Sequence, residues 1–259
     1  MLRQVLITEF AKLRRSAVPW VTLAVMLLAP WGIALFMWIV LDPRRAASLG
    51  LLGTKANLAG LEATWPAYAG YLSMIVGAAG MLLLAFIVAY LFGREYVDQT
   101  AKNLLALPIR REWFALAKLT VAAAWWLAIA LAAFAEGLLI GALLGLPDFS
   151  PAVVTDALGN ALLLAGVSYL LCPVVAWLTV ATRNLLASIG FALGMLLLGD
   201  LLGHTGWGVW FPWSIIPSLS GMSGTAAVSI QPVSIVMLVA VFLAGIAATA
   251  AQLRLADNP

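Results

Sequence analysis

Residues that could carry out covalent chemistry are few and scattered in this chain of 259 residues. His204 is the only histidine, so an H-E-x-x-H zinc motif is impossible, and we expect an outer-loop side chain without a metal partner. A hydrolase would need His204 as its base and nearby Asp200 as its acid, but the sequence has no G-x-S-x-G turn to present a serine. The serines of that segment are Ser214, Ser218 and Ser220.

The sequence also lacks the G-x-x-x-x-G-K-[ST] loop that binds the phosphates of a nucleotide. No stretch has the alternating strands and helices of an α/β domain. We therefore predict that this chain does not hydrolyse nucleotide by itself and holds no cofactor and no metal. One cysteine, Cys172, excludes an internal disulfide framework.

Glu136 is the one acidic residue well inside an apolar run. A lone charge at mid-bilayer costs about 2.5–3.5 kcal/mol on insertion scales, so such residues usually face the bundle interior or a wet cavity. Glu136 could line a substrate path or sense protons, or it could be protonated and hydrogen-bonded between helices in a structural role. Glycines at four-residue spacing favour close helix packing around it and elsewhere: Gly137, Gly141 and Gly145, then Gly190 with Gly194 and Gly199 with Gly203.

A polar segment, residues 92–112, separates two long apolar runs. Its middle is typical of a short helix, with Asp98 or Thr100 as N-cap and Pro108 as the stop. Leu104 and Leu105 give that helix an apolar side. Because a short capped helix between two spans is poorly suited to solvent alone, we interpret the segment as a docking element.

The composition indicates a membrane protein. The chain is 64% hydrophobic and 10% charged, a balance that no ordinary soluble domain has, and its 11 tryptophans suit membrane–water interfaces. The formal charge of +3 is small and its basic residues are divided among loops, which argues against a nucleic-acid partner. We predict an all-α polytopic membrane protein with a single transmembrane domain over residues 1–259.

Residues 2–17 are basic and amphipathic. We expect a helix lying in the membrane interface with its apolar side toward lipid, and with Glu9 and Lys12 mostly elsewhere around it. A merely solvated basic N-terminus is the alternative. The apolar run 18–41 is too long for the core of a signal peptide but long enough to span a bilayer.

Five further spans are predicted by the same criterion. Lys118 lies near one end of the third span, and we expect it to extend outward to the interface. Asp156 lies near the start of the fourth span and Asp200 near the end of the fifth. The predicted ranges are about 68–92, 113–146, 154–182, 185–202 and 233–253.

The distribution of Lys and Arg predicts the orientation. Eleven of the 14 lie in the N-terminal segment, in the 93–118 region and at Arg183 and Arg254, whereas only three lie in the opposite loop. Since short cytoplasmic loops are enriched in Lys and Arg, both termini and the 93–112 segment are predicted to be cytoplasmic. Residues 203–232 are then outside. They have no acidic or basic side chain but many Trp and Pro residues, so they either dip back into the outer leaflet as short helices or form an ordered interfacial loop.

Two segments of the sequence resemble the permease subunits of type-2 ABC exporters, in particular those around the bacitracin and lantibiotic self-protection pumps. The N-terminus has the family's E-x-x-K-x-x-R rhythm at Glu9, Lys12 and Arg15. The polar segment is similar to the family's R-E-x-x-x-G-T-x-x-x-L-L-x-x-P-I-x-R pattern followed by Lys118. Six spans with an aromatic stretch between the fifth and sixth complete the resemblance. Where the family has Gly before the Thr, this chain has Gln99, and Gly there would permit a positive φ, so the local turn is expected to differ.

The resemblance implies a dimer with a second permease, identical or similar, and two copies of a separate ATPase subunit that would hold ATP and Mg. It implies that residues 93–112 are the coupling segment that contacts the ATPase, and that the chain lies in a bacterial cytoplasmic membrane. We expect an apolar or amphipathic cargo, such as a peptide antibiotic or a lipid-like molecule. The coupling residues would be Arg94, Glu95, Asp98, Thr100, Asn103, Leu104, Leu105, Arg110 and Arg111.

Two other functions remain open. An accessory or sensory membrane subunit would share the docking surface but would move no substrate. A membrane-embedded lipid-modifying enzyme would need clustered polar groups at one depth, whereas the acids of this chain are scattered singly.

Overall fold

The computed structural model describes residues 2–42, 44, 62–100, 111–221 and 230–255, and every regular element within them is a helix. Thr64, Ser150 and Asn184 are N-caps whose side chains accept hydrogen bonds from backbone N–H groups of the first turn. The elements are α1 (Leu2–Arg14), α2 (Val18–Val40), α4 (Trp65–Met74), the π-helical η2 (Ile75–Ala79), α5 (Gly80–Val97), α7 (Arg111–Leu144), α8 (Pro151–Thr182), α9 (Leu185–Gly203), the 3-10 helices η3 (Gly206–Trp210) and η4 (Pro212–Ser214), α10 (Ile215–Ser220) and α11 (Pro232–Leu255).

Six helical stretches in the described part are long and apolar enough to cross a bilayer, which confirms the predicted all-α polytopic fold. Their bounds differ from the predicted ones at the polar segment. The second span is one helical stretch from α4 to the end of α5, so it continues past 92 and contains Arg94 and Glu95. The third begins at Arg111. The beginning of the polar segment therefore belongs to the second span, and its end belongs to the third.

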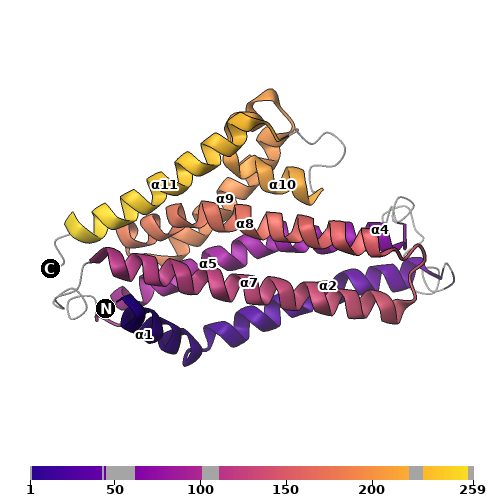
Figure 1. Cartoon of the computed structure of the whole chain (residues 1–259), viewed down its shortest axis with the longest axis horizontal. Coiled ribbons are helices and arrows are strands. Elements are labelled where there is room, and N and C mark those ends of the chain that lie inside the picture. Colours follow the sequence, from indigo (N-terminus) through magenta and orange to yellow (C-terminus); the bar gives the residue numbers. More distant parts are fainter. Residues whose placement is uncertain (1, 43, 45–61, 101–110, 222–229, 256–259) are drawn as a thin grey trace.

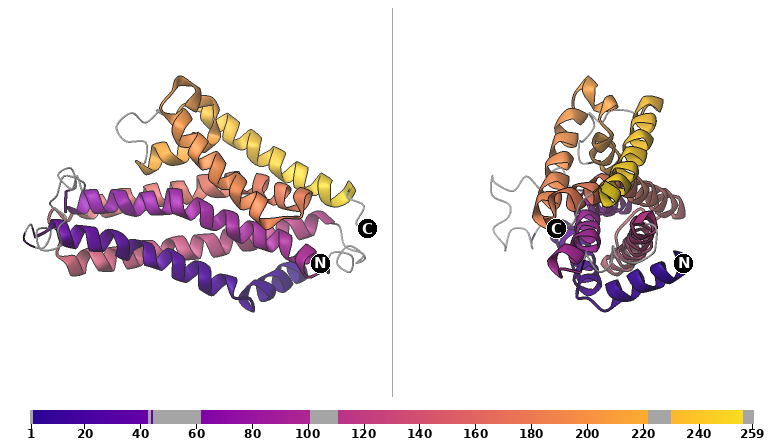
Figure 2. Two further views of the ribbon diagram at one scale, coloured as in Figure 1. Left: turned by 180° about the vertical axis from the view of Figure 1, so that it is seen from behind. Right: turned by 90° about the vertical axis from the view of Figure 1, so that its left-hand side faces the viewer.

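Four of the spans lie roughly side by side along the long axis of the molecule: α2, the α4–α5 stretch, α7 and α8 (Figures 1 and 2). α1 crosses the side of this bundle near the end where both chain termini lie. α11 packs on α8 and slants away from the bundle toward its own N-terminal end. Gly245 allows the contact, because a Cβ there would lie 2.8 Å from the backbone nitrogen of Val174.

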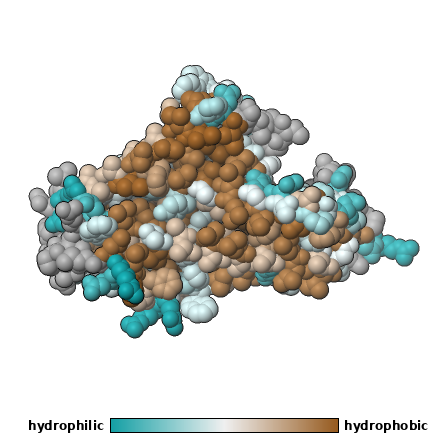
Figure 3. Space-filling model, viewed as in Figure 1, coloured by the Kyte–Doolittle hydropathy of each residue, from teal (hydrophilic) through white to brown (hydrophobic). Residues whose placement is uncertain are grey.

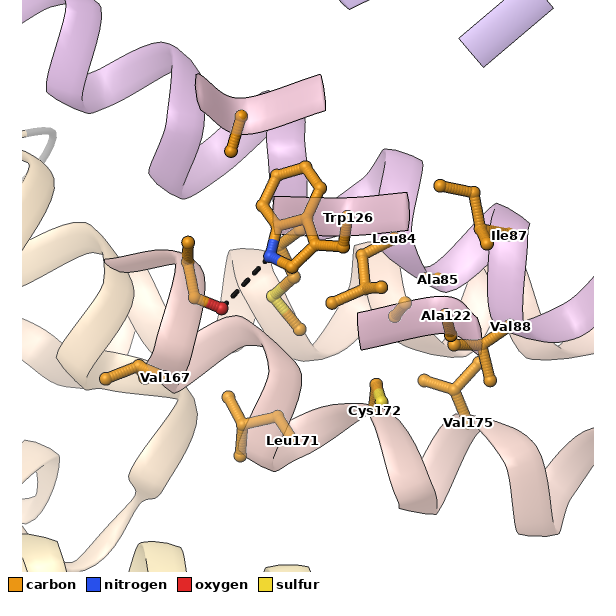
Figure 4. Packing of buried hydrophobic residues seen from close by; sticks show 14 of the residues in the cluster. Leu84, Ala85, Ile87, Val88, Ala122, Trp126, Val167, Leu171, Cys172 and Val175 are labelled. Carbon is orange, nitrogen blue, oxygen red and sulfur yellow. Dashed lines mark hydrogen bonds between the residues drawn. The ribbon is translucent and has the colours of Figure 1, made fainter. Parts of the chain in front are cut away.

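The core of the bundle is centred on Trp126 of α7, which is 2% exposed (Figure 4). Its indole N–H donates to the carbonyl oxygen of Ala165 on α8, at 3.0 Å, so the one polar atom of the ring is satisfied. Gly80 at the start of α5 makes room for the ring, since a Cβ there would lie 2.3 Å from it. Gly137 and Gly141 serve the predicted close packing within the chain, against Leu72 and Trp65 of α4.

The aromatic segment after α9 is helical and packed against the bundle. Ile215 and Ile216 are buried, Asn160 of α8 donates to the carbonyl of Leu219, and the Cβ of Ser220 approaches Gly77 of the π-helical turn. Short helices with a backbone covered by protein were one of the two predicted arrangements.

The surface and the helix lengths agree with a membrane location. Apolar side chains cover most of the middle of the visible face, and polar side chains gather toward its ends (Figure 3). α7 has 34 residues and is therefore about 50 Å long, whereas the hydrocarbon layer is about 30 Å thick. A helix of that length carries its first turns, with their charged side chains, beyond the apolar layer.

Candidate functional site

Four charged side chains meet where α1, the end of α5 and the beginning of α7 converge. We call Glu9, Lys12, Glu95 and Lys118 the charge cluster. Glu9, Glu95 and Lys118 are 1%, 6% and 4% exposed, and Lys12 is partly exposed at the edge. Charges are almost never buried unless they are paired, so the arrangement of these four groups decides whether the three helix ends hold together.

Lys118 is the centre of the cluster. Its Nζ donates to Glu9 Oε2 at 3.0 Å, to Glu95 Oε1 at 2.6 Å and to the carbonyl oxygen of Leu91 at 2.5 Å. An ammonium group has three N–H donors, and all three are used. The prediction that Lys118 extends outward to the interface is therefore wrong: two carboxylates and a main-chain carbonyl on neighbouring helices hold it inside the protein.

Lys12 closes the cluster from the side of α1. Its Nζ lies 2.6 Å from Glu9 Oε1 and 3.4 Å from Glu95 Oε1, so two lysines and two glutamates neutralise one another. Burial alone would raise the pKa of Glu9, but the charges of Lys118 and Lys12 and the hydrogen bonds that they donate outweigh it, and the pKa is lowered. Burial would lower the pKa of Lys12, but hydrogen bonding and attraction to both glutamates raise it.

Glu9 corrects the expected orientation of α1. Val5, Glu9 and Leu13 recur every four residues and form one buried stripe, so Glu9 lies in the middle of the packed face and not among the outward charges. Val5 packs against Phe114 and Ala117 of α7. The apolar side of α1 thus faces protein more than lipid, although Ile7 and Phe10 remain exposed.

Arg94 ties the end of α5 to α1 from outside the cluster. Its Nη1 donates to the carbonyl oxygen of Lys12 at 3.2 Å, and its Nε donates to Asp98 Oδ2 at 3.0 Å. Asp98 is the C-cap residue of α5, so of the two N-caps predicted for a following helix, Asp98 or Thr100, Asp98 is wrong. Residues 101–110 of that predicted helix lie outside the described residues. The carbonyl oxygen near the C-terminus of α1 is one that helix geometry leaves without an intrahelical donor.

The end of α5 is a Schellman motif. The backbone N–H of Thr100 bonds to the carbonyl of Glu95 at 2.9 Å, and that of Gln99 bonds to the carbonyl of Tyr96 at 3.3 Å. Gln99 takes the left-handed position with a φ of +54°. The expectation of a different turn at this position is therefore wrong, because Gln99 adopts the conformation that a glycine would take.

Arg111 belongs to a separate contact at the beginning of α7. Its Nη1 donates to the carbonyl oxygens of Leu253 and Arg254, at 2.7 and 3.1 Å, and the side chain of Arg254 pairs with Glu112. These bonds join α7 to the last turn of α11.

The structure therefore divides the residues predicted from sequence. It brings Glu9, Lys12, Glu95, Arg94 and Asp98 to one place. It leaves Thr100 and Arg15 exposed, and it directs the side chain of Arg111 to the end of α11. Asn103, Leu104, Leu105 and Arg110 lie outside the described residues. The burial of Glu9 was missed, although its position four residues from Val5 and four from Leu13 could have indicated it.

Glu136 lies apart from the cluster, half-buried between α7 and α2. The indole N–H of Trp31 donates to Glu136 Oε1 at 2.8 Å. The other oxygen, Oε2, is buried and has no hydrogen-bond partner among the described residues.

The charged helix ends, the six spans and the predicted motifs agree with the comparisons. The chain belongs to the ABC-2 family of transporters: residues 5–199 match the model described as ABC-2 family transporter protein. It is therefore a multi-pass membrane subunit of a transporter system that includes a partner ATPase.

A curated relative makes the likeness more specific. Over 184 residues the chain is 27% identical to the bacitracin transport permease protein BCRB of Bacillus licheniformis. The matched residues make up 71% of this chain and 88% of that relative. The resemblance predicted from sequence is confirmed. No solved structure gives a significant match.

Proposed function

We propose that this chain is the membrane-spanning subunit of an ATP-driven exporter, and that the charge cluster transmits the movement of the coupling segment to the spans. The observation that carries this proposal is the position of Lys118. It joins the helix before the segment, through Glu95, to the helix after it, and both to α1 through Glu9.

A displacement of the coupling segment would then move three helix ends as one unit. Separating buried, mutually neutralised charges exposes each of them to an environment that cannot replace its partner, which costs several kcal/mol. Closing of the ATPases on ATP would push on this unit and shift the spans between two packings. The bonds of Arg111 to the end of α11 would extend the movement to the sixth span.

The working assembly in this proposal has two permease chains, a homodimer in the simplest case, and two ATPase subunits that hold ATP and Mg. The cluster end of the bundle and both termini lie in the cytosol, and the membrane is the bacterial cytoplasmic membrane. The cargo is an apolar or amphipathic compound, such as a peptide antibiotic or a lipid-like molecule. The name of the bacitracin permease supports this class.

Glu136 is proposed to border the path of that cargo. Its Oε2 is buried and accepts no bond from the described residues, so a polar group of a molecule that enters between α2 and α7 would find an acceptor there. Buried acceptors that stay open are costly, and such groups within spans usually serve transport.

The test compares variants of the coupling segment with a matched control, all with the partner ATPase present. Leu104→Asp with Leu105→Asp should abolish co-purification of the ATPase in mild detergent, and Glu95→Gln should retain the ATPase but lose drug export. Ile230→Asp, an apolar-to-acid change just before α11, should change neither the co-purification of the ATPase nor the export. Normal export by the Leu104/Leu105 variant would overturn the docking assignment, and an ATPase that binds without any export by the wild type would favour a sensory subunit.

A further inference from the structure

An apolar groove lies between α1 and α7. Its volume is about 660 Å³, and it is open on one side. The floor and walls are almost wholly apolar, with Leu6 and Phe10 from α1 and Val121 and Ala124 from α7. Arg14 and Arg15 lie at the groove where α1 ends.

Neither arginine side chain has an ion-pair partner among the residues that the structure describes. Glu9 and Glu95, the nearest carboxylates in the cluster, are taken by Lys12 and Lys118. Both Arg14 and Arg15 are exposed. An apolar groove with two free cations at one end is therefore complementary to a molecule with an anionic head and an apolar tail.

The groove also lies at the depth where such molecules occur. Arg14 and Arg15 come just before Val18, where the first span begins. The indole N–H of Trp125 on α7 donates to Thr22 Oγ1 on α2, at 3.1 Å, so the groove residues of α7 are level with the first turns of that span. The guanidinium groups are therefore at the depth of lipid headgroups, and the apolar floor is at the depth of the first acyl carbons.

We propose that the groove is a binding site for an anionic phospholipid, whose phosphate contacts Arg14 and Arg15 and whose acyl chain lies along Leu6, Phe10, Val121 and Ala124. A lipid there would fill the wedge between the interface helix and the third span. It would thereby hold α1, and with it Glu9, against α7. The proposal depends on the membrane class of the chain but not on the proposed coupling to an ATPase.

The test uses the purified full-length chain in a neutral detergent. Phosphatidylglycerol or phosphatidylcholine is added, and the bound lipid is counted by native mass spectrometry beside the thermal unfolding midpoint. The wild type should retain phosphatidylglycerol in preference and be stabilised by it. Arg14→Gln with Arg15→Gln should weaken that preference about 25-fold, since each basic residue near an anionic lipid surface contributes about a factor of five.

Two controls separate the lipid site from general charge and from a simple anion site. Arg3→Gln with Arg44→Gln removes the same charge from exposed positions outside the groove and should retain the preference. Ala124→Phe and Ala11→Phe fill the groove from its two walls and should each reduce lipid retention with both arginines in place. Equal retention of the two lipids, equal loss in the Arg3/Arg44 variant, unchanged retention in both filled variants, or equal stabilisation by glycerol phosphate would each overturn the proposal.

Discussion

The charge cluster and Glu136 both take a carboxylate away from water, and they do so in different ways. In the cluster, each glutamate has a lysine at hydrogen-bond distance, and Lys118 uses every proton that it has. Among the described residues, Glu136 has a single neutral donor, Trp31, and its other carboxylate oxygen has no hydrogen-bond partner. The arrangement in the cluster attaches the helices rigidly to one another. The arrangement at Glu136 leaves a hydrogen-bond acceptor for a molecule other than this chain.

The largest effect is expected for removal of the central lysine. Lys118→Met leaves two buried glutamates with only Lys12, at the edge, to neutralise them, and breaking a buried ion pair on one side costs about 3–5 kcal/mol. The thermal midpoint in detergent should fall sharply, and the yield of folded chain with it.

The control for that change removes the orphaned charge as well. Lys118→Met combined with Glu95→Gln should recover a large part of the lost stability, because one carboxylate no longer lacks its cation. A single Lys118→Met variant with an unchanged midpoint would show that the cluster does not hold the helix ends.

The same cluster predicts how stability depends on pH. The pKa of Glu9 is lowered in the folded chain, so its contribution is complete above the ordinary value of 4.5 and is lost as pH falls through the lower folded value. The pKa of Lys12 is raised, so its contribution is complete below 10.5 and is lost as pH rises through the higher folded value. Unfolding midpoints measured across pH should be flat near neutrality and fall on both sides.

Two variants assign the two limbs of that profile. Glu9→Gln should flatten the acid limb, and Lys12→Gln should flatten the alkaline limb, each with a smaller loss at neutral pH than Lys118→Met. An acid limb that persists unchanged in Glu9→Gln would show that another carboxylate causes it.

The sequence predicted the spans well because their signal is additive. A run of about twenty apolar residues can be recognised as a span without knowing which helices it contacts. The errors were at the ends of spans, for example where α5 continues to Val97. A helix end at that place depends on the Schellman bonds and on the left-handed Gln99, which no hydropathy pattern reports.

The site was predicted less completely, since its residues are joined only in space. Glu9 and Lys118 are 109 positions apart, and each taken alone looks like an ordinary interfacial charge. The family rhythm identified both Glu9 and Lys12, but not that Glu9 points inward. The four-residue step from Val5 through Glu9 to Leu13 contained that information, because a polar residue in the middle of a buried stripe needs a partner from another helix.

A smaller effect is expected at Glu136. Trp31→Phe removes the indole donor and should lower the free energy of unfolding by about 0.6 kcal/mol, the average measured for interhelical hydrogen bonds in a membrane protein. Trp20→Phe makes the same change at another exposed position of α2, is the control, and should cost nothing measurable. Glu136→Gln separates the two interpretations: export lost at an unchanged unfolding midpoint supports the cargo path, and export retained with a lowered midpoint supports a structural role.

The smallest effect tests the junction between the cluster and the coupling segment. A left-handed conformation costs a residue with a Cβ about 1–2 kcal/mol, and glycine adopts it freely but loses about 0.5–1 kcal/mol more chain entropy on folding. Gln99→Gly should therefore raise the free energy of unfolding by about 0.5–1 kcal/mol, measured as a higher thermal midpoint. Gln99→Ala keeps the strain and should not raise it. If glycine and alanine gave the same midpoint, the turn that ends α5 would not hold position 99 in the left-handed region, and the link from Glu95 to the coupling segment would be looser than the Schellman bonds require.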